Sequence, residues 1–194
     1  MNVKVLQAIY LNLISMHLPN FHNISYLKNG SPVQQNLYQI LTSEKVFEKL
    51  NAFNPVLIGT FPLDITTPES DVDIACHVVD VESFRKIMFS CFGQREAYCF
   101  KGEMIRKKVV RIATFKLEGI PFEVYGENAP VQDQWGYQHM MIEFELLRRF
   151  GEPLRSEVLR LKRRGWTTEE AFVEVLGLDG HDPYQTLLNF KLTV

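Results

Sequence analysis

The order of hydrophobic and polar residues predicts short strands in the middle of the chain. Pro55–Gly59 is an apolar run that ends in glycine, as in a buried strand followed by a tight turn. Asp71–Val79 alternates well enough to form a second strand. Val109–Leu117 and Ile120–Tyr125 are rich in β-branched and aromatic residues, and Glu118-Gly119 joins them. That last pattern is typical of an antiparallel hairpin.

The segments on either side of these strands show the spacing of amphipathic helices. Val33–Phe53 is predicted to be helical, as one helix or as two short helices with Ser43 as the N-cap of the second. Glu82–Phe92 is predicted to form a helix between two of the strands. The last third of the chain holds four further predicted helices: Gln134–Phe150, Glu152–Arg164, Glu169–Leu176 and Pro183–Phe190.

Local signals mark helix starts and loops. Thr167 with Glu170 three positions later forms a capping-box pattern, and Asp182 before a proline is typical of an N-cap. Asn20–Pro32 and residues 61–70 are rich in proline, asparagine, threonine and serine, so we expect both to be loops.

The combined pattern predicts an α+β fold with its strands between Pro55 and Tyr125. We expect residues 1–132 to form an α/β core with N-terminal helices, and residues 133–194 to form a helical region packed on that core as one compact unit. Val3–Leu18 is expected to be an amphipathic helix or a buried segment, because it is too short and too polar to span a membrane.

Composition and charge narrow the range of partners. The 194 residues are 46% hydrophobic and 23% charged, with a formal net charge of −2. A protein that grips many backbone phosphates is usually basic overall, so this balance argues against an extended nucleic-acid surface. Three cysteines without CxxC or Cys/His ligand spacing argue against a disulfide scaffold or a structural zinc site. A reducing cytoplasm fits this cysteine usage best.

The most informative stretch combines a glycine turn with two acids. Gly59 ends an apolar strand and is followed by Thr60, whose hydroxyl and N–H are suitable donors to a phosphate oxygen. Asp71 and Asp73 are two positions apart, so on a strand their side chains share one face. Two carboxylates held together repel each other, and a divalent cation such as Mg²⁺ removes that penalty.

Glu123 is the best candidate for a third acid. It lies between Phe122 and Val124 in an otherwise apolar predicted strand, so its carboxylate faces either solvent or a ligand. Three carboxylates could hold two metal ions, in the arrangement that clamps the attacking and leaving oxygens of a phosphoryl transfer.

The stretch Ser70-Asp71-Val72-Asp73-Ile74, with Asp71 twelve positions after Gly59, resembles the signature of the DNA polymerase beta-like nucleotidyltransferases. The resemblance implies a mixed sheet flanked by helices, with Asp71, Asp73 and Glu123 as metal ligands and Gly59, Thr60 and Ser70 near the nucleotide. The chain is also similar to a bacterial family of unknown function that shares this core. That similarity extends to Tyr137-Gln138-His139-Met140 and Asp182-Pro183-Tyr184.

The sequence departs from the superfamily pattern at three positions. Asp64 stands where a second glycine is frequent, Thr60 replaces the commoner serine, and the third acid is the longer Glu123. The crowding implied by Asp64 and the altered reach of Glu123 leave open whether the site turns over a substrate.

Three readings of function follow. The first is a nucleotidyltransferase dependent on Mg²⁺ or Mn²⁺, which transfers a nucleoside monophosphate from a nucleoside triphosphate such as ATP to a hydroxyl on a small molecule or protein. The second is a non-catalytic nucleotide-binding or regulatory module with the same fold. The third is an interaction protein whose acids only cap loops, and it predicts no magnesium-dependent nucleotide binding.

Other polar and aromatic residues have two open interpretations each. The basic stretch before the hairpin includes Arg106 and Lys107; it is either a solvated surface or a source of phosphate contacts, with Lys107 as the nucleotide-binding candidate. His139 is either a hydrogen-bonded structural residue or a catalytic group. Trp135 and Trp166 either pack in the core or stack on a base.

Overall fold

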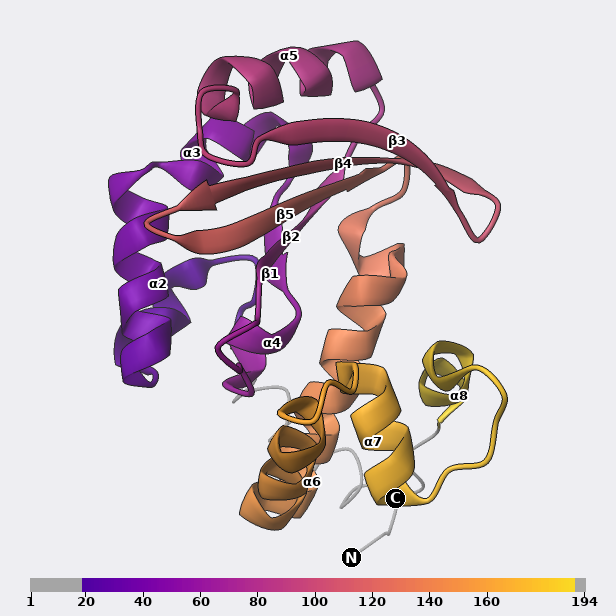
Figure 1. Cartoon of the computed structure of the whole chain (residues 1–194). Coiled ribbons are helices and arrows are strands. Elements are labelled where there is room, and N and C mark those ends of the chain that lie inside the picture. The colour runs from indigo at the N-terminus through magenta and orange to yellow at the C-terminus, as the bar shows by residue number, and fades with distance from the viewer. Residues whose placement is uncertain (1–18, 191–194) are drawn as a thin grey trace, which may run out of the picture.

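The computed structural model describes residues 19–190. A five-stranded mixed sheet lies at one end, and a group of helices from the last third of the chain lies at the other (Figure 1). The strands are β1 Val56–Ile58, β2 Val72–His77, β3 Cys99–Ile105, β4 Lys108–Leu117 and β5 Ile120–Glu127. The α-helices are α2 Pro32–Ser43, α3 Val46–Leu50, α4 Thr60–Leu63, α5 Val81–Phe92, α6 Trp135–Lys162, α7 Thr168–Leu176 and α8 Pro183–Asn189.

The sheet has the strand order β1-β2-β5-β4-β3. Only the central pair, β2 and β5, is parallel; the other three pairings are antiparallel. Between β2 and β5 the chain passes through α5 and the β3–β4 hairpin, so the two parallel strands become neighbours although they lie far apart in sequence. In their register Asp73 is paired with Glu123.

One face of the sheet is buried against α2, α3 and α5. Leucine and isoleucine side chains of α2 pack there, and Phe84 and Phe92 of α5 meet the inward residues of the strands. The rings of Phe92, Phe115 and Phe122 form a continuous stack with centroid separations of 4.4 and 5.4 Å. Alternation along the strands sends Val72 and Ile74 into this core, and it therefore turns the residues between them to the opposite face.

A second core joins the opposite face of the sheet to the C-terminal helices. Ile58 and Ala75 of the sheet belong to the same buried cluster as Leu146 and Val158 of α6 and Phe172 of α7. This cluster fixes the helices beneath the sheet without filling all of the space between them.

Several expectations are confirmed. The fold is α+β, as predicted, with a mixed sheet flanked by helices. Glu118 and Gly119 both have positive φ and close the β4–β5 hairpin. Thr167 forms the predicted capping box with Glu170, and Asp182 caps α8. The break predicted between the helices ending at Phe150 and starting at Glu152 appears as a kink of α6 at Gly151, whose φ is 63°.

Other expectations are wrong in instructive ways. The region Asn20–Pro32 contains a 3-10 helix, Ile24–Asn29, and residues 61–70 begin with the short helix α4. Ser43 is the last residue of α2; the N-cap of α3 is Lys45, which has left-handed geometry and makes no side-chain cap bond. Strand β3 was not predicted, because its exposed edge position leaves no clear apolar alternation.

The predicted helix or buried segment Val3–Leu18 lies outside the described residues. Within residues 19–190, every helix is too short or too polar to cross a membrane.

Candidate active site

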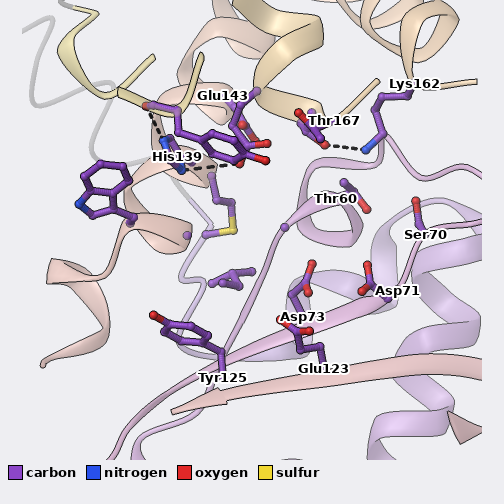
Figure 2. Close-up of a pocket in the computed structure, with 18 of the residues that line it drawn as sticks. Thr60, Ser70, Asp71, Asp73, Glu123, Tyr125, His139, Glu143, Lys162 and Thr167 are labelled. Carbon is purple, nitrogen blue, oxygen red and sulfur yellow. Dashed lines mark hydrogen bonds and ion pairs between the residues drawn. The ribbon is translucent and has the colours of Figure 1, made fainter. Parts of the chain in front are cut away.

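A cavity of about 650 Å³ lies between the open face of the sheet and helices α6, α7 and α8. The sheet side contributes the β1–α4 turn and residues of β2 and β5, and the helical side contributes residues of all three helices. Figure 2 shows that acidic and hydroxyl side chains project into this space from both sides. The cavity thus gathers polar groups from segments that are far apart in the sequence.

The three predicted acids lie together on the sheet side of this cavity (Figure 2). Asp73 of β2 and Glu123 of β5 are opposite each other in the parallel register, so their side chains leave the sheet on the same face. Asp71 immediately precedes β2 rather than lying within it. Neighbouring residues Val72, Phe122 and Val124 are buried on the other face. Strand alternation therefore presents Asp73 and Glu123 to the cavity, and Asp71 lines it from the position just before β2.

Electrostatic interactions among the three acids are repulsive. Burial raises the pKa of Asp73 well above its ordinary value, and Asp71 and Glu123 raise it further. Burial also raises the pKa of Glu123, with Asp71 as the next cause. Negative charge gathered in a partly buried place favours either protons or a cation.

The donor set fits a hard divalent cation. Carboxylate oxygens are the ligands that Mg²⁺ and Mn²⁺ prefer, and Asp71, Asp73 and Glu123 offer them from one side of an open cavity. Across residues 19–190, however, no group of three or more His, Cys, Asp or Glu side chains is drawn together as closely as a metal site requires. The role of these acids as metal ligands is therefore a proposal, which is developed below.

The turn after β1 is shaped around Asp73. Gly59 has φ 75° and ψ −143°, a conformation that side chains rarely adopt. A Cβ atom at this position would lie 2.4 Å from Oδ2 of Asp73. Thr60 follows, and its hydroxyl is buried on the cavity wall without a hydrogen-bond partner. The absence of a side chain at Gly59 therefore leaves room for the Asp73 carboxylate. The next residue, Thr60, has a hydroxyl without a hydrogen-bond partner.

Ser70 also lines the cavity, next to Asp71. Its hydroxyl accepts a hydrogen bond of 2.9 Å from the backbone N–H of Thr67 and lies 3.4 Å from Oγ1 of Thr67, so its proton can turn to that oxygen or to a ligand. Of the predicted nucleotide-binding residues, Gly59, Thr60 and Ser70 are therefore brought together with the acids.

Lys107 is not brought to the site. It lies exposed at the tip of the β3–β4 hairpin, outside the cavity lining, so its nucleotide contact stays a prediction without support from the geometry. Its neighbour Arg106 does line the cavity, with its guanidinium carbon 4.0 Å from the ring centroid of Trp135 and 5.0 Å from that of Tyr184. Trp166 also lines the cavity and is 39% exposed, so its ring is accessible to a ligand.

Asp64 has a structural role that explains its departure from the superfamily pattern. It ends α4 with φ 56°, the left-handed conformation in which glycine is common. Its carboxylate accepts a 2.6 Å hydrogen bond from the hydroxyl of Ser31, and Arg155 donates to its carbonyl. Asp64 does not line the cavity, so it does not crowd a phosphate there.

We expect Asp64→Asn to leave function intact. The amide oxygen can still accept from Ser31, so the free energy of unfolding should fall by no more than about 1 kcal/mol. Magnesium-dependent nucleotide binding, measured by calorimetry, should change less than twofold. A loss of that binding would place Asp64 in the site and contradict this assignment.

Three charged residues of the helical wall, Glu143, Lys162 and Glu169, are not among the site residues predicted from the sequence. Lys162, at the end of α6, lines the cavity and donates a 2.6 Å hydrogen bond to Oγ1 of Thr168. Burial lowers the pKa of Lys162, and the negative charges of Glu143 and Glu169 act to raise it. The available signal was periodicity. Lys162 lies four positions after the buried Val158, on the inward side of an otherwise basic helix.

Glu143 is the most buried acid of this wall. It lies between Met140 and Leu147 on the inward stripe of α6, and it is only 3% exposed. Burial raises its pKa well above the ordinary value of 4.5, and Glu169 raises it further. A charged residue in an apolar stripe is the sequence feature that could have identified it.

Glu143→Gln should raise the melting temperature at pH 7, by an amount equivalent to about 1–3 kcal/mol, because an unfavourable buried charge is removed. The raised pKa means that the folded protein binds more protons than the unfolded chain above pH 4.5. Its stability therefore falls as pH rises through that window, and the advantage of the variant should disappear near pH 4.5. Thermal unfolding from pH 4.5 to pH 8 measures this.

The matched control for this experiment is Glu145→Gln, which removes a carboxylate paired with Arg148 at 2.9 Å on the same helix. That variant should show no such gain at neutral pH. An advantage of Glu143→Gln that is the same at every pH would contradict the assignment of a raised pKa.

His139 is held by the fold. Its Nε2 lies 2.9 Å from the carbonyl oxygen of Tyr184, so this nitrogen must carry the proton that is donated. Its Nδ1 lies 3.6 Å from Oε1 of Glu169. The histidine therefore ties α6 to α7 and α8 at the helical wall, which favours the structural interpretation.

Comparison with solved structures relates the fold to known polymerases. The chain matches a Cid1 poly(U) polymerase solved with MgGTP at a TM-score of 0.50 and 9% identity, over 69% of this chain and 42% of that one. It matches the polymerase core of the TRAMP RNA surveillance complex at a TM-score of 0.50 and 14% identity, over 84% of this chain and 50% of that one. It matches a structure of the GLD-2/RNP-8 complex at a TM-score of 0.50 and 12% identity, over 79% of this chain and 61% of that one.

These likenesses concern the fold alone, because the identities are low. The chain covers about two fifths to three fifths of the length of these three matched chains. No curated protein matches the sequence. The likeness shows that this chain shares the fold of these solved structures.

Family membership rests on a separate match. Residues 39–190, which include the glycine turn, the three acids and the helical wall, match the model of the family described as "Domain of unknown function (DUF4269)". That match covers most of the chain. The chain therefore belongs to the DUF4269 family, and it has a nucleotidyltransferase-like fold.

Proposed function

We propose that this protein is a metal-dependent nucleotidyltransferase that moves a nucleoside monophosphate from a nucleoside triphosphate to a hydroxyl acceptor. One observation carries the proposal: Asp71, Asp73 and Glu123 face the same cavity beside the Gly59 turn. Three acids that raise one another's pKa are poorly explained by packing, because each would be more stable apart from the others.

Asp71, Asp73 and Glu123 are the residues that would hold Mg²⁺ or Mn²⁺. When bound, the ion would neutralise phosphate charge and lower the pKa of the acceptor hydroxyl. The Glu123 carboxylate, which faces the cavity from β5, could accept or relay the hydroxyl proton.

Hydroxyl and cationic groups of the cavity complete the proposed site. Thr60 and Ser70 have hydroxyl protons to donate to phosphate oxygens, and Gly59 lets the backbone approach them. Lys162 places positive charge between the acids of the sheet and those of the helices. Trp166 presents an accessible ring on which a base could stack.

The structural likenesses give this proposal context. One matched polymerase was solved with MgGTP, which is a fact about that protein. For this chain it supports a nucleoside triphosphate as the donor. The acidic net charge favours a small molecule or a protein over a nucleic acid as the acceptor.

Calorimetry with nucleoside triphosphates tests the proposal. We expect binding in the presence of Mg²⁺ and a large loss of binding after Glu123→Gln. The control variant, Glu157→Gln, changes a carboxylate on the outer surface of α6, where it pairs with Arg160 at 2.8 Å, and should bind normally. A parallel assay of pyrophosphate release then separates the alternatives.

The binding and pyrophosphate-release measurements together distinguish three possible functions. Nucleotide binding with pyrophosphate release supports the transferase. Binding without release under any acceptor mixture supports the non-catalytic nucleotide-binding module. Absence of magnesium-dependent binding would exclude both and leave the interaction protein.

A further inference from the structure

The helical wall of the cavity carries a second acidic pair that the proposed reaction does not use. Glu143 of α6 and Glu169 of α7 both line the cavity. Figure 2 places Glu143 on the helical side, across from Asp73 and Glu123 on the strands. The pair faces the same space as the reacting groups and comes from a different part of the chain.

Glu143 is a buried group without a complete set of partners. Its side chain is 3% exposed, and its Oε1 atom is shielded from solvent with no hydrogen-bond partner. Buried carboxylate oxygens normally have partners, because an unsatisfied one is costly. Since Glu143 lines the cavity, a molecule bound there can supply the missing hydrogen-bond donor.

Nearby protein groups do not satisfy it. Lys162, whose charge acts on Glu143, donates a 2.6 Å hydrogen bond to Thr168. None of the ion pairs among residues 19–190 includes Glu143. Of the two nitrogens of His139, Nε2 serves the carbonyl of Tyr184 and Nδ1 faces Glu169 at 3.6 Å. The pair Glu143 and Glu169 therefore retains acceptor capacity toward the cavity.

The chemistry of this pair selects a particular kind of ligand group. Carboxylates accept hydrogen bonds, so they match N–H donors, and charged donors bind them most strongly. Burial raises the pKa of Glu143, and repulsion from Glu169 raises it further; a cation between the two acids would remove that repulsion. A phosphate would be repelled, so this end of the cavity is unsuited to the triphosphate.

We propose that Glu143 and Glu169 form the acceptor subsite and bind a protonated amine of the acceptor molecule. This inference rests on the proposed function, and it defines the substrate class as hydroxyl compounds that also carry an ammonium group, such as amino sugars or amino alcohols. The hydroxyl would reach the acids of the sheet while the amine is held at the helices.

The experiment uses the full-length protein with Mg²⁺ and a nucleoside triphosphate. A panel of amino sugars and amino alcohols, each paired with the analogue that has a hydroxyl in place of the amine, is assayed for stimulation of pyrophosphate release. Glucosamine and glucose are one such pair. We expect at least one amine to give a kcat/KM at least tenfold above its neutral partner.

Variants then locate the amine. Glu143→Gln and Glu169→Gln should raise the KM for the preferred amine at least tenfold and leave the KM for the nucleotide within twofold. The control Glu145→Gln, on the same helix and outside the cavity lining, should change neither value. The unchanged nucleotide KM also shows that the variants are folded.

The proposal is overturned if no amine in the panel exceeds its neutral partner, or if the preference survives in both variants. It is also overturned if Glu143→Gln instead weakens the nucleotide, most tellingly GTP, whose base carries two adjacent N–H donors. If the wild-type protein releases pyrophosphate in these cases, the proposed function stands although the amine subsite does not. If the wild-type protein neither binds nor turns over nucleotide, the proposed function fails first.

Discussion

Asp73→Asn should abolish nucleotide transfer while making the protein without metal more stable. Asp73 is the central acid of the three, paired in register with Glu123 and repelled by Asp71. Loss of a shared metal ligand removes several kcal/mol of transition-state stabilisation, so the rate should fall on the order of 10³-fold or more. Pyrophosphate release and thermal unfolding, each with and without Mg²⁺, measure the two effects.

The gain in stability follows from the same electrostatics. An asparagine has the same shape as Asp73 but no charge, so the free energy of unfolding without metal should rise by about 1–3 kcal/mol at pH 7. Wild-type protein should gain stability from Mg²⁺, and the variant should gain little. A variant that is less stable, or that responds to Mg²⁺ as the wild type does, would show that Asp73 is not part of a repulsive metal-binding set.

Gly59→Ala is expected to damage both stability and nucleotide binding. The new Cβ would lie 2.4 Å from Oδ2 of Asp73, and the residue would be held at φ 75°. Backbone strain of this kind costs about 1–3 kcal/mol, and the collision displaces the Asp73 carboxylate in addition. Denaturant unfolding gives the stability change, and calorimetry with a nucleoside triphosphate and Mg²⁺ gives the functional one.

Gly119→Ala is the matched control, because it separates strain from collision. Gly119 has φ 79° in the β4–β5 turn, and its added Cβ would meet nothing within 4 Å. This variant should lose stability through backbone strain and keep nucleotide binding. If Gly59→Ala binds nucleotide as well as Gly119→Ala does, the close approach of Gly59 to Asp73 has no functional role.

The sheet side of the site could be predicted from sequence because its signals are local. Gly59 marks the end of a strand, Asp71 and Asp73 are separated by the period of a strand, and Glu123 interrupts an apolar strand. Only the register that joins Asp73 to Glu123 depends on tertiary structure. Because Val72 and Phe122 are buried on one face of the sheet, the neighbouring acids must lie on the opposite face.

The helical wall could not be predicted in the same way. Lys162 belongs to a run of basic residues, and its helical spacing from Val158 indicates the side of α6 on which it lies without revealing the cavity there. Glu143 and Glu169 meet because α7 packs on α6, which no local pattern specifies. The contribution of Arg106 depends on the turn between β4, which is predicted, and β3, which is not; this turn places Arg106 against Trp135.

Misassigned local elements also have physical causes. Ser43 has the chemistry of an N-cap, but Lys45 takes a left-handed conformation that starts α3 two residues later. Asp64 is polar in a segment predicted to be loop, yet its left-handed geometry ends a short helix and its carboxylate is occupied by Ser31. In both cases the backbone conformation decided the outcome, and residue type alone does not reveal it.

The central claim is that Asp71, Asp73 and Glu123 together bind a divalent ion that carries a nucleotide. A crystal structure of the protein with Mn²⁺ and a non-hydrolysable nucleoside triphosphate tests it most directly, because anomalous scattering locates the manganese. We predict manganese bound by oxygens of Asp71 and Asp73, with Glu123 beside the α-phosphate and Thr60 donating to the phosphate chain. Manganese found elsewhere, or a nucleotide bound without contact to any of the three acids, would contradict the account.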